Sequence, residues 1–379
     1  MKNTIQRLNE LGQSAWCDNL SRSMIDSTQR APATSGLRSM MAAGIVGVTS
    51  NPTIFMKAIT TGVEYDARFD ERTAQGLEGM SLYEGLVVPD IADAADLLRP
   101  VYDETNRLDG LVSLEVDPRL ARDTRATVAE ARRLFKHLDR PNVFIKVPAT
   151  PEGIPAIETL IGEGININVT LIFSLTAYDQ VMRAYLSGLK RLYANGGDLT
   201  KVASVASFFV SRVDSLVDKL LSQHGHLGET KNLIGKAAIA NAKLAYRRFE
   251  EVFHSRGEFG ELARFGARVQ RPLWASTSTK NPSFPDTVYV DQLIGPHTVN
   301  TMPPETILAV LDHGTVATTI HDGLSEAEKL FAALARLGID MDAVTKQLEI
   351  EGVNAFVKSF DELLSHLDKK SARACTAKT

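Results

Sequence analysis

Residues 143–171 read VFIKVPATPEGIPAIETLIGEGININVTL and contain two strand-like runs, Val143–Val147 and Ile165–Leu171, with a helical pattern between them. The first run is apolar apart from Lys146, as is typical of a parallel strand that is covered on both faces. A strand, a helix and a second strand in this order form a β-α-β unit, which joins neighbouring parallel strands. The stretch therefore predicts an α/β protein built on a parallel sheet.

The same pattern continues on both sides of this stretch. Six further strands are predicted at Ser14–Cys17, Ile45–Thr49, Leu111–Val116, Val202–Val210, Pro272–Ala275 and Thr298–Met302. Eight strands, each followed by a helical pattern, favour a closed (β/α)8 TIM barrel over an open doubly wound sheet. We find no internal repeat and no linker rich in Pro, Gly or Ser in the 379 residues, so one domain over 1–379 is the simplest interpretation.

Helices are predicted around this barrel and beyond it. A short amphipathic helix is expected at the N-terminus, and further helices at Leu120–Leu138, Ala177–Ala194, Leu233–Arg256, Glu305–Asp312 and Ser325–Leu367. The Lys and Arg side chains on the outer face of Leu233–Arg256 are interpreted as a solvated surface. The barrel core is expected over about 14–313, a C-terminal helical extension over about 314–368, and a frayed tail over 369–379. The extension could cover the barrel mouth through Phe356 and Phe360, or pack beneath it.

Composition and charge exclude some classes of partner. The formal net charge of -4 gives no general attraction to nucleic acid, although a few local cations can still hold one phosphate. The two cysteines, Cys17 and Cys375, form no disulfide framework, which suits a reducing cytosol, and the eight histidines show no zinc-binding spacing. No run of 18 apolar residues is present. We expect a cytoplasmic monomer or homodimer with no metal, no cofactor and no membrane or nucleic-acid partner.

Polar residues gather where the predicted strands end, which is where TIM barrels carry their active sites. In chain order these candidates are Asp18, Asn51, Glu115, Lys146, Asn168, Thr170, Ser207, Arg212, Ser276 and Lys280. Lys146 stands out because an ammonium group inside an apolar strand is costly to bury without a partner. It could pair with Glu115 or extend out of the barrel. Alternatively, desolvation could lower its pKa and leave an amine that attacks a carbonyl group.

The second alternative predicts a chemistry that needs no metal or cofactor. An imine on Lys146 would turn a ketone into an electron sink, so that a carbon–carbon bond could break. The proton transfers of such a reaction need acids and bases, and Asp18 and Glu115 are the candidates, although carboxylates at strand ends also cap helices. Each of these residues alone is a weak signal. Together with Lys146, the two carboxylates form one connected hypothesis.

The remaining candidates suit a phosphorylated sugar. Asn168 and Thr170 alternate with apolar residues, so both should face the barrel interior, where amide and hydroxyl groups could bind sugar hydroxyls. Asn51 has the same potential but could also be a turn residue, because Pro52 follows it. Arg212 and Lys280 lie beyond the sixth and seventh strands. With Ser276 they resemble an anion clamp, although singly each could be a surface charge.

Five motifs resemble the transaldolase family and occur in the family's order. They are VTSNPTIF at 48–55, LEVDPRL at 114–120, IKVPAT at 145–150, NVTLIFS at 168–174 and SFFVSR at 207–212. The resemblance covers roughly residues 14–310 and implies a class I aldolase mechanism in the non-oxidative pentose phosphate pathway. A dihydroxyacetone unit would pass from sedoheptulose 7-phosphate or fructose 6-phosphate to an aldose phosphate acceptor, glyceraldehyde 3-phosphate or erythrose 4-phosphate.

The resemblance also implies a role for each matching residue. Lys146 would form the imine, Asp18 would act as the acid and base in carbon–carbon cleavage, and Glu115 with Thr170 would position a catalytic water. The residues expected to bind substrate are Asn51, Asn168, Ser207, Phe209, Arg212, Ser276 and Lys280. The chain departs from many family members at Lys280, where they carry Arg in a shorter loop. This feature resembles the longer transaldolase subgroup, and Lys is a point charge rather than a bidentate fork.

Two other functions remain as alternatives. A lyase similar to fructose 6-phosphate aldolase would share the imine but release free dihydroxyacetone. A non-catalytic barrel that binds sugar phosphates would keep Arg212 and Lys280 without needing Lys146. The long chain, and the pairing of Glu115 with Thr170, favour the transferase. Cys17, beside Asp18, could make the site sensitive to oxidation unless it is buried.

Overall fold

The computed structural model describes residues 2–29, 32–223, 230–255 and 257–376. Eight parallel strands close into a barrel in chain order, and β1 pairs with β8 through Cys17 and Met302. The strands are β1 (Gln13–Cys17), β2 (Gly47–Val48), β3 (Leu111–Glu115), β4 (Val143–Pro148), β5 (Ile167–Ile172), β6 (Ser204–Phe209), β7 (Arg271–Ala275) and β8 (Thr298–Met302). The predicted (β/α)8 barrel with extra helices is confirmed, and each of the eight strands overlaps its predicted range.

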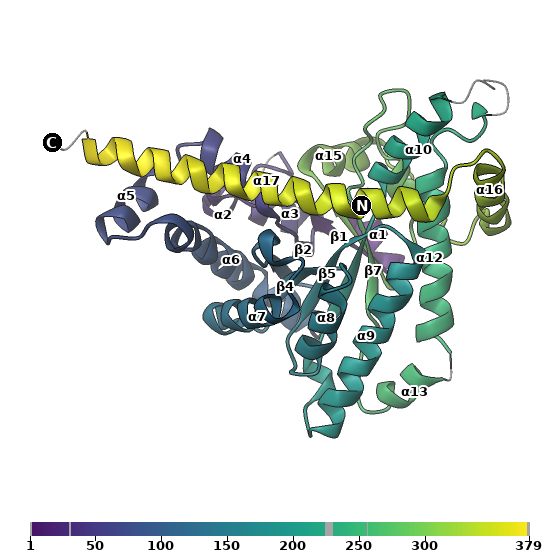
Figure 1. Cartoon of the computed structure of the whole chain (residues 1–379), viewed down its shortest axis with the longest axis horizontal. Coiled ribbons are helices and arrows are strands. Elements are labelled where there is room, and N and C mark those ends of the chain that lie inside the picture. Colours follow the sequence, from purple (N-terminus) through teal and green to yellow (C-terminus); the bar gives the residue numbers. More distant parts are fainter. Residues whose placement is uncertain (1, 30–31, 224–229, 256, 377–379) are drawn as a thin grey trace.

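Helices surround the barrel and extend beyond it (Figure 1). In the first half they are α1 (Thr4–Glu10), α2 (Arg22–Asp26), α3 (Leu37–Ala43), α4 (Pro52–Thr61), α5 (Asp66–Ala74), α6 (Gly79–Glu104), α7 (Thr124–Leu138) and α8 (Gly153–Ile161). In the second half they are α9 (Leu175–Ala194), α10 (Ser211–Gln223), α12 (Ala237–Phe253), α13 (Glu258–Ala263), α14 (Val288–Asp291), α15 (Pro304–His313), α16 (Leu324–Arg336) and α17 (Met341–Thr376). The 3-10 turns η1 (Pro118–Leu120) and η2 (Leu199–Lys201) complete the set.

Local chemistry explains most differences from the predicted boundaries. The helix expected from Leu120 begins instead at Thr124, because Asp123 accepts a hydrogen bond from the backbone N–H of Ala126 at 2.9 Å and caps it there. Strand β2 is only two residues long. A Cβ at Gly47 would lie 2.5 Å from the indole of Trp16, so glycine is what allows the tryptophan to pack against this strand.

Helix α17 crosses the molecule from α16 to α5, as the yellow helix of Figure 1 shows. It packs against α4, α6, α10 and β5. The prediction of a frayed tail is wrong for residues 369–376, because α17 continues to Thr376. Lys370 pairs with Asp66 of α5, and its ammonium lies 4.5 Å from the ring centroid of Phe69, which holds this end of the helix. The last residues of the predicted tail, 377–379, lie outside the described part.

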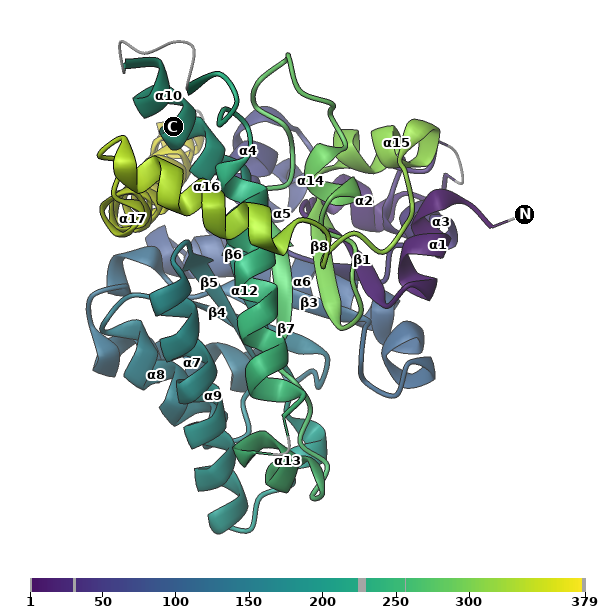
Figure 2. The same ribbon diagram turned by 90° about the vertical axis from the view of Figure 1, so that its right-hand side faces the viewer.

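The interpretation of Leu233–Arg256 as a solvated charged helix is also wrong in part. Helix α12 begins only at Ala237, and Arg256 is not among the described residues. Helix α16 packs across α12 (Figure 2). The loop before α16 covers Lys243 of α12. The Nζ of Lys243 donates to the carbonyl groups of Thr319 and Asp322 in this loop, at 2.9 and 2.8 Å. The C-terminal extension therefore covers part of the face that was expected to meet solvent.

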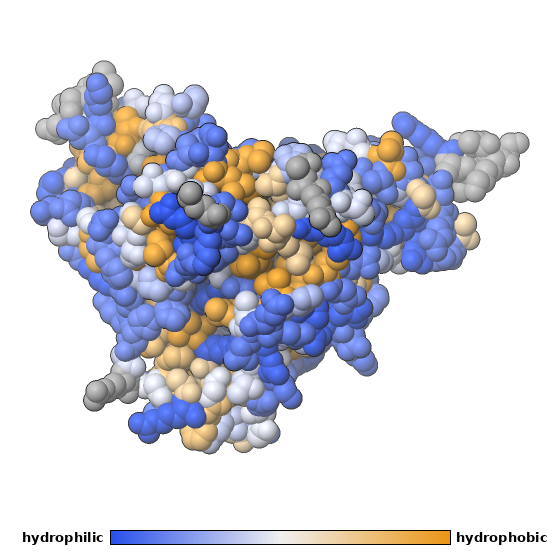
Figure 3. Space-filling model, turned by 180° about the vertical axis from the view of Figure 1, so that it is seen from behind, coloured by the Kyte–Doolittle hydropathy of each residue, from blue (hydrophilic) through white to orange (hydrophobic). Residues whose placement is uncertain are grey.

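Hydrophobic side chains remain visible in the middle of the back face, between hydrophilic side chains on its outer parts (Figure 3). Among the described residues, no helix combines the length and the apolar character that crossing a membrane requires.

Candidate active site

The carboxyl ends of the strands surround a cavity of about 280 Å³. Eight of the predicted site residues line it, namely Asp18, Asn51, Lys146, Ser207, Phe209, Arg212, Ser276 and Lys280. Glu115, Asn168 and Thr170 are not among the lining residues and lie on the strands that flank β4. The register pairs Glu115 with Lys146, and Lys146 with Asn168, so three neighbouring strands present these side chains at one level of the barrel. The sequence-predicted residues thus converge on one end of the barrel.

Lys146 lies at the base of this cavity and is 4% exposed. Its Nζ donates to the carbonyl oxygen of Ser50 at 3.2 Å and lies 3.6 Å from Oε2 of Glu115. The side chain therefore points into the barrel rather than out of it. Lys146 both pairs with Glu115 and lines the cavity. A primary amine is held next to a buried carboxylate, at a place that a ligand can reach.

Glu115 and Thr170 each carry a buried oxygen that has no hydrogen-bond partner among the described residues, Oε2 of Glu115 and Oγ1 of Thr170. Buried polar atoms of this kind are normally satisfied by water or by a ligand. Burial raises the pKa of the Glu115 carboxyl to about 7, against the opposing effect of the Lys146 ammonium. A carboxyl group with a pKa near neutrality can both accept and donate a proton at physiological pH.

Asp18 follows β1 and is only partly buried, because it lines the cavity. Thr49 donates its hydroxyl hydrogen to Oδ1 of Asp18 at 2.6 Å, and a second threonine, Thr301, lies 2.7 Å from that hydroxyl. Burial raises the pKa of the Asp18 carboxyl, while the charges of Lys146 and Arg212 oppose this rise. Thr49 therefore fixes one carboxylate oxygen of Asp18 beside the cavity that Lys146 lines.

The amides and hydroxyls of the site divide into two groups. Asn168 is fully buried, donates to Oγ of Ser113 at 3.0 Å and accepts from Oγ of Ser207 at 2.7 Å, and it does not line the cavity. This geometry gives Asn168 a clear role in holding Ser207. Asn51 lines the cavity and caps α4 by accepting from the N–H of Ile54 at 3.0 Å. That cap uses only the amide oxygen, so the two amide hydrogens stay available to a ligand.

Positive charge gathers at the mouth of the cavity. Arg212 is the second residue of α10, its guanidinium lies 5.5 Å from the ring centroid of Phe209, and it has no ion pair within the described residues. Burial lowers the pKa of the Arg212 guanidinium. Lys280 donates to Oγ of Ser278 at 2.6 Å, and burial and the charge of Arg212 lower the pKa of its ammonium. An anion at the mouth would relieve this repulsion.

The sequence prediction did not include two charged residues that line the cavity, Lys57 and Glu305. Lys57 contributes to the lowered pKa of Lys280, so it belongs to the same cluster of charges. Thr53 and Lys57 are four residues apart on α4 and both line the cavity, a helical spacing that could have revealed Lys57. Of the two placements considered for the C-terminal extension, the structure shows the first, because Phe356 of α17 lies at the barrel mouth. Phe360 packs instead against Tyr83, with ring centroids 5.1 Å apart.

We predict that Lys57→Gln weakens the binding of phosphorylated substrates without changing their chemistry. Loss of one partly solvated charge should raise KM about threefold to tenfold and leave kcat unchanged. Steady-state kinetics with fructose 6-phosphate would measure both constants. Lys358→Gln is the matched control, since Lys358 is an exposed lysine of α17 that lies outside the cavity lining. An unchanged KM in Lys57→Gln, or an equal rise in the control, would contradict the assignment.

Cys17 is fully buried, and burial raises the pKa of its thiol above the usual range, which disfavours the reactive thiolate. Within the described ranges, no cluster of three or more His, Cys, Asp or Glu side chains has the arrangement of a metal site.

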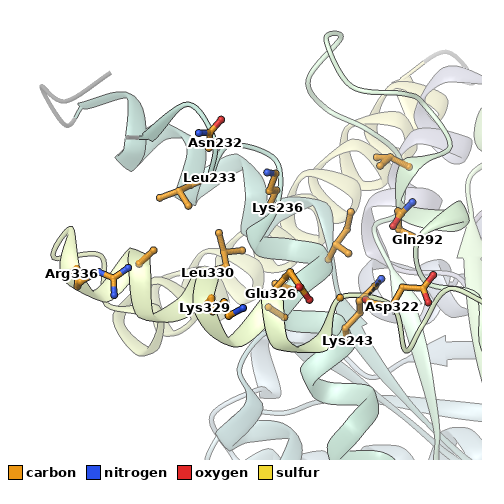
Figure 4. A pocket seen from close by; sticks show the side chains of 16 residues that line it. Asn232, Leu233, Lys236, Lys243, Gln292, Asp322, Glu326, Lys329, Leu330 and Arg336 are labelled. Carbon is orange, nitrogen blue, oxygen red and sulfur yellow. Dashed lines mark hydrogen bonds between the residues drawn. The ribbon is translucent and has the colours of Figure 1, made fainter. Parts of the chain in front are cut away.

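A larger cavity of about 710 Å³ lies between α12, α14 and α16 and contains none of the predicted site residues (Figure 4). Leu233 and Leu330 are among the apolar side chains that line it.

A strand-borne lysine, two carboxylates close to it and a cationic cavity mouth, all at the carboxyl end of a parallel barrel, define an aldolase-type barrel enzyme. The sequence model described as Transaldolase/Fructose-6-phosphate aldolase matches residues 15–367. The chain is 46% identical to Transaldolase 2 of Nostoc sp. over 379 residues, covering 97% of each chain. It is 48% identical to a transaldolase of Thermobifida fusca over 373 residues, covering 98% of this chain and 99% of the relative. The chain therefore belongs to the transaldolase/fructose-6-phosphate aldolase family, as its motifs predicted.

Proposed function

We propose that this chain is a transaldolase, which moves a dihydroxyacetone unit between sugar phosphates through an imine on Lys146. The donor would be sedoheptulose 7-phosphate or fructose 6-phosphate, and the acceptor glyceraldehyde 3-phosphate or erythrose 4-phosphate, as in the pentose phosphate pathway. The observation that carries this proposal is the buried amine of Lys146 at the base of the cavity, with Glu115 3.6 Å away. The names of the relatives, which match nearly the whole chain, support the same activity.

The geometry supports a sequence of proton transfers around that amine. The amine of Lys146 adds to the ketone carbon, and loss of water from the adduct leaves an imine. Asp18 then takes the proton of the hydroxyl group at C4 of the donor, the bond between C3 and C4 breaks, and the electron pair moves into the imine to give an enamine. The aldose leaves, the enamine attacks the aldehyde carbon of the acceptor, and Asp18 returns its proton to the new hydroxyl group.

Water must leave when the imine forms and return when it is hydrolysed. The unpartnered oxygens of Glu115 and Thr170 would hold that water beside Lys146, and the carboxyl group of Glu115 would exchange protons with it. The phosphate end of the substrate would lie at the cavity mouth between Arg212, Lys280 and Lys57. Asn51 and Ser207 would bind hydroxyl groups of the dihydroxyacetone part.

Glu115 gives this proposal a pH dependence. If the carboxylate is the active form, a pKa of about 7 means that kcat falls as the pH decreases through 7, because protonation removes the base. Glu115→Gln should remove this acid limb and lower kcat by about 10²-fold. The measurement is kcat against pH for both proteins. Glu305→Gln, which changes an exposed carboxylate at the mouth of the same cavity, should keep the limb. An unchanged limb in Glu115→Gln would exclude this role for Glu115.

The second candidate is a lyase that releases free dihydroxyacetone, which the family description also includes. Product analysis with fructose 6-phosphate, with and without erythrose 4-phosphate as acceptor, separates the two functions. A transaldolase gives sedoheptulose 7-phosphate only when it is supplied with erythrose 4-phosphate, and little free dihydroxyacetone in either case. Release of free dihydroxyacetone at the same rate without an acceptor would instead establish the lyase.

The cellular setting follows from the proposed substrates. Such an enzyme would act in the cytoplasm, where phosphorylated sugars are interconverted, as a monomer or homodimer. Light scattering coupled to size-exclusion chromatography would determine which of the two states it adopts.

A further inference from the structure

A second cavity, of about 400 Å³, lies at the opposite end of the barrel. Leu111 and Phe144, near the beginnings of β3 and β4, form part of its wall, together with Val205 of β6. The loop before β3, the segment before β7, Phe259 of α13 and His297 before β8 also line it. The strands begin here, whereas Lys146 lies toward their carboxyl ends. This cavity is therefore separate from the candidate active site.

Among the residues that the structure describes, the charged side chains that line this cavity are all basic. They are Arg107, Arg268, Arg271 and, when it is protonated, His297. Arg271 is neutralised, because it pairs with Asp109 at 3.1 Å and also donates to Oγ of Ser14 at 2.7 Å. Asp109 is also engaged by the indole N–H of Trp16 at 3.0 Å. The hydroxyl of Ser14 also donates to the Asp109 carboxylate, at 2.8 Å, so three donors already share this carboxylate.

Arg107 and Arg268 have no such compensation. Across the described ranges, neither guanidinium forms an ion pair with a carboxylate. Arg107 donates only a long hydrogen bond, 3.4 Å, to the carbonyl oxygen of Thr200. Burial lowers the pKa of the Arg268 guanidinium, and the charges of Arg107 and Arg271 lower it further. Two cations are held close together in a partly buried place, where an anion would stabilise both.

The backbone around this cavity is strained. Asn106, Arg107 and His297 have φ values of 50°, 69° and 57°, in the left-handed region that favours glycine. The described chain has six non-glycine residues with positive φ, and these three line the cavity. Two others lie at the candidate active site: Leu171 follows Thr170 on β5, and Ser276 follows the end of β7. Strain of this kind persists where the local geometry serves a function. An arginine at position 107 keeps a guanidinium at the cavity, although glycine would fit the backbone better.

We propose that this cavity is a second phosphate site, which binds the phosphate group of a small phosphorylated metabolite between Arg107 and Arg268. The planar guanidinium groups suit the geometry of phosphate oxygens, which can accept paired hydrogen bonds from each. The remainder of such a metabolite would lie against Leu108, which lines the cavity and is 46% exposed, and the volume of about 400 Å³ accommodates it. The site is independent of the chemistry at Lys146, so it does not rest on the proposed function.

The test counts phosphate sites by equilibrium dialysis with labelled inorganic phosphate. An Arg212→Gln background weakens phosphate binding at the barrel mouth, so that binding at the second site can be measured alone. This background should still bind one phosphate. Adding Arg107→Gly or Arg268→Gln should weaken the remaining binding about tenfold or more, because each removes a charge-assisted contact. Arg264→Gln, an exposed arginine outside the cavity lining, is the matched control and should bind like the background.

Thermal unfolding separates loss of binding from loss of the fold. Because Arg107 has a positive φ, Arg107→Gly should melt at the same temperature as its parent or at a higher one, even though it binds phosphate more weakly. The proposal is overturned if the Arg212→Gln background shows no saturable binding. It is also overturned if Arg107→Gly and Arg268→Gln both bind phosphate as the background does, or if Arg264→Gln weakens binding equally.

Discussion

Lys146→Arg should abolish transfer of the dihydroxyacetone unit, lowering kcat on the order of 10⁴-fold or more. Arginine keeps the positive charge beside Glu115, so the buried ion pair and the fold should persist. A guanidinium cannot form the imine, because it stays protonated and lacks a nucleophilic amine lone pair. The measurement is formation of sedoheptulose 7-phosphate from fructose 6-phosphate and erythrose 4-phosphate.

Lys243→Arg is the matched control for this substitution. Lys243 is 5% exposed, similar to Lys146, but it lies under the C-terminal extension, away from the cavity that Lys146 lines. Its replacement should leave kcat within a few-fold of the wild-type value. Retention of more than a hundredth of the activity in Lys146→Arg, with the control unaffected, would show that the amine is not the nucleophile.

Asp18→Asn should lower kcat by about 10²- to 10⁴-fold while leaving imine formation intact. Asparagine has the same shape, and its amide oxygen can still accept the 2.6 Å hydrogen bond from Thr49. What it loses is the ability to take a proton from the donor hydroxyl group. Substrate should therefore still bind and form the imine on Lys146, but the carbon–carbon bond should break slowly.

The adduct distinguishes this prediction from simple damage to the site. After reduction with borohydride, Asp18→Asn should carry the intact six-carbon adduct of fructose 6-phosphate, whereas wild type should carry mainly the three-carbon adduct. If the variant carries no adduct at all, or cleaves the donor at nearly the wild-type rate, Asp18 does not have the proposed role. Mass spectrometry of the Lys146 peptide gives both outcomes in one experiment.

Much of the barrel was predictable because its strands can be recognised from short local runs of apolar residues. Val143–Pro148, for example, is apolar apart from Lys146. A parallel barrel places the carboxyl ends of all its strands together. The fold class alone therefore predicted that Asp18 and Arg212 would meet Lys146. Strand β2 was predicted too long. Its shape depends on the close approach of Trp16 to Gly47, a contact between residues that are far apart in the sequence, so no local pattern reveals it.

The features that the sequence did not reveal all depend on tertiary contacts. The sequence left open whether the C-terminal extension covers the barrel mouth, and only the fold places Phe356 of α17 at the cavity. No local pattern indicates that Lys370 reaches Asp66 and orders the tail. The left-handed backbone at Leu171, where the register of β5 shifts beside Thr170, is likewise set by packing. A Cβ at Gly352 of α17 would lie 2.9 Å from the Leu171 side chain, so the extension packs directly on the strand that carries Thr170.

Borohydride trapping tests the central claim most directly. The wild-type protein is incubated with fructose 6-phosphate, reduced with sodium borohydride, digested and analysed by mass spectrometry. We predict a reduced three-carbon dihydroxyacetone adduct on the peptide that contains Lys146 and on no other lysine. A folded protein that cleaves fructose 6-phosphate without any adduct, or that carries the adduct on a different lysine, would contradict the assignment of Lys146 as the imine-forming residue.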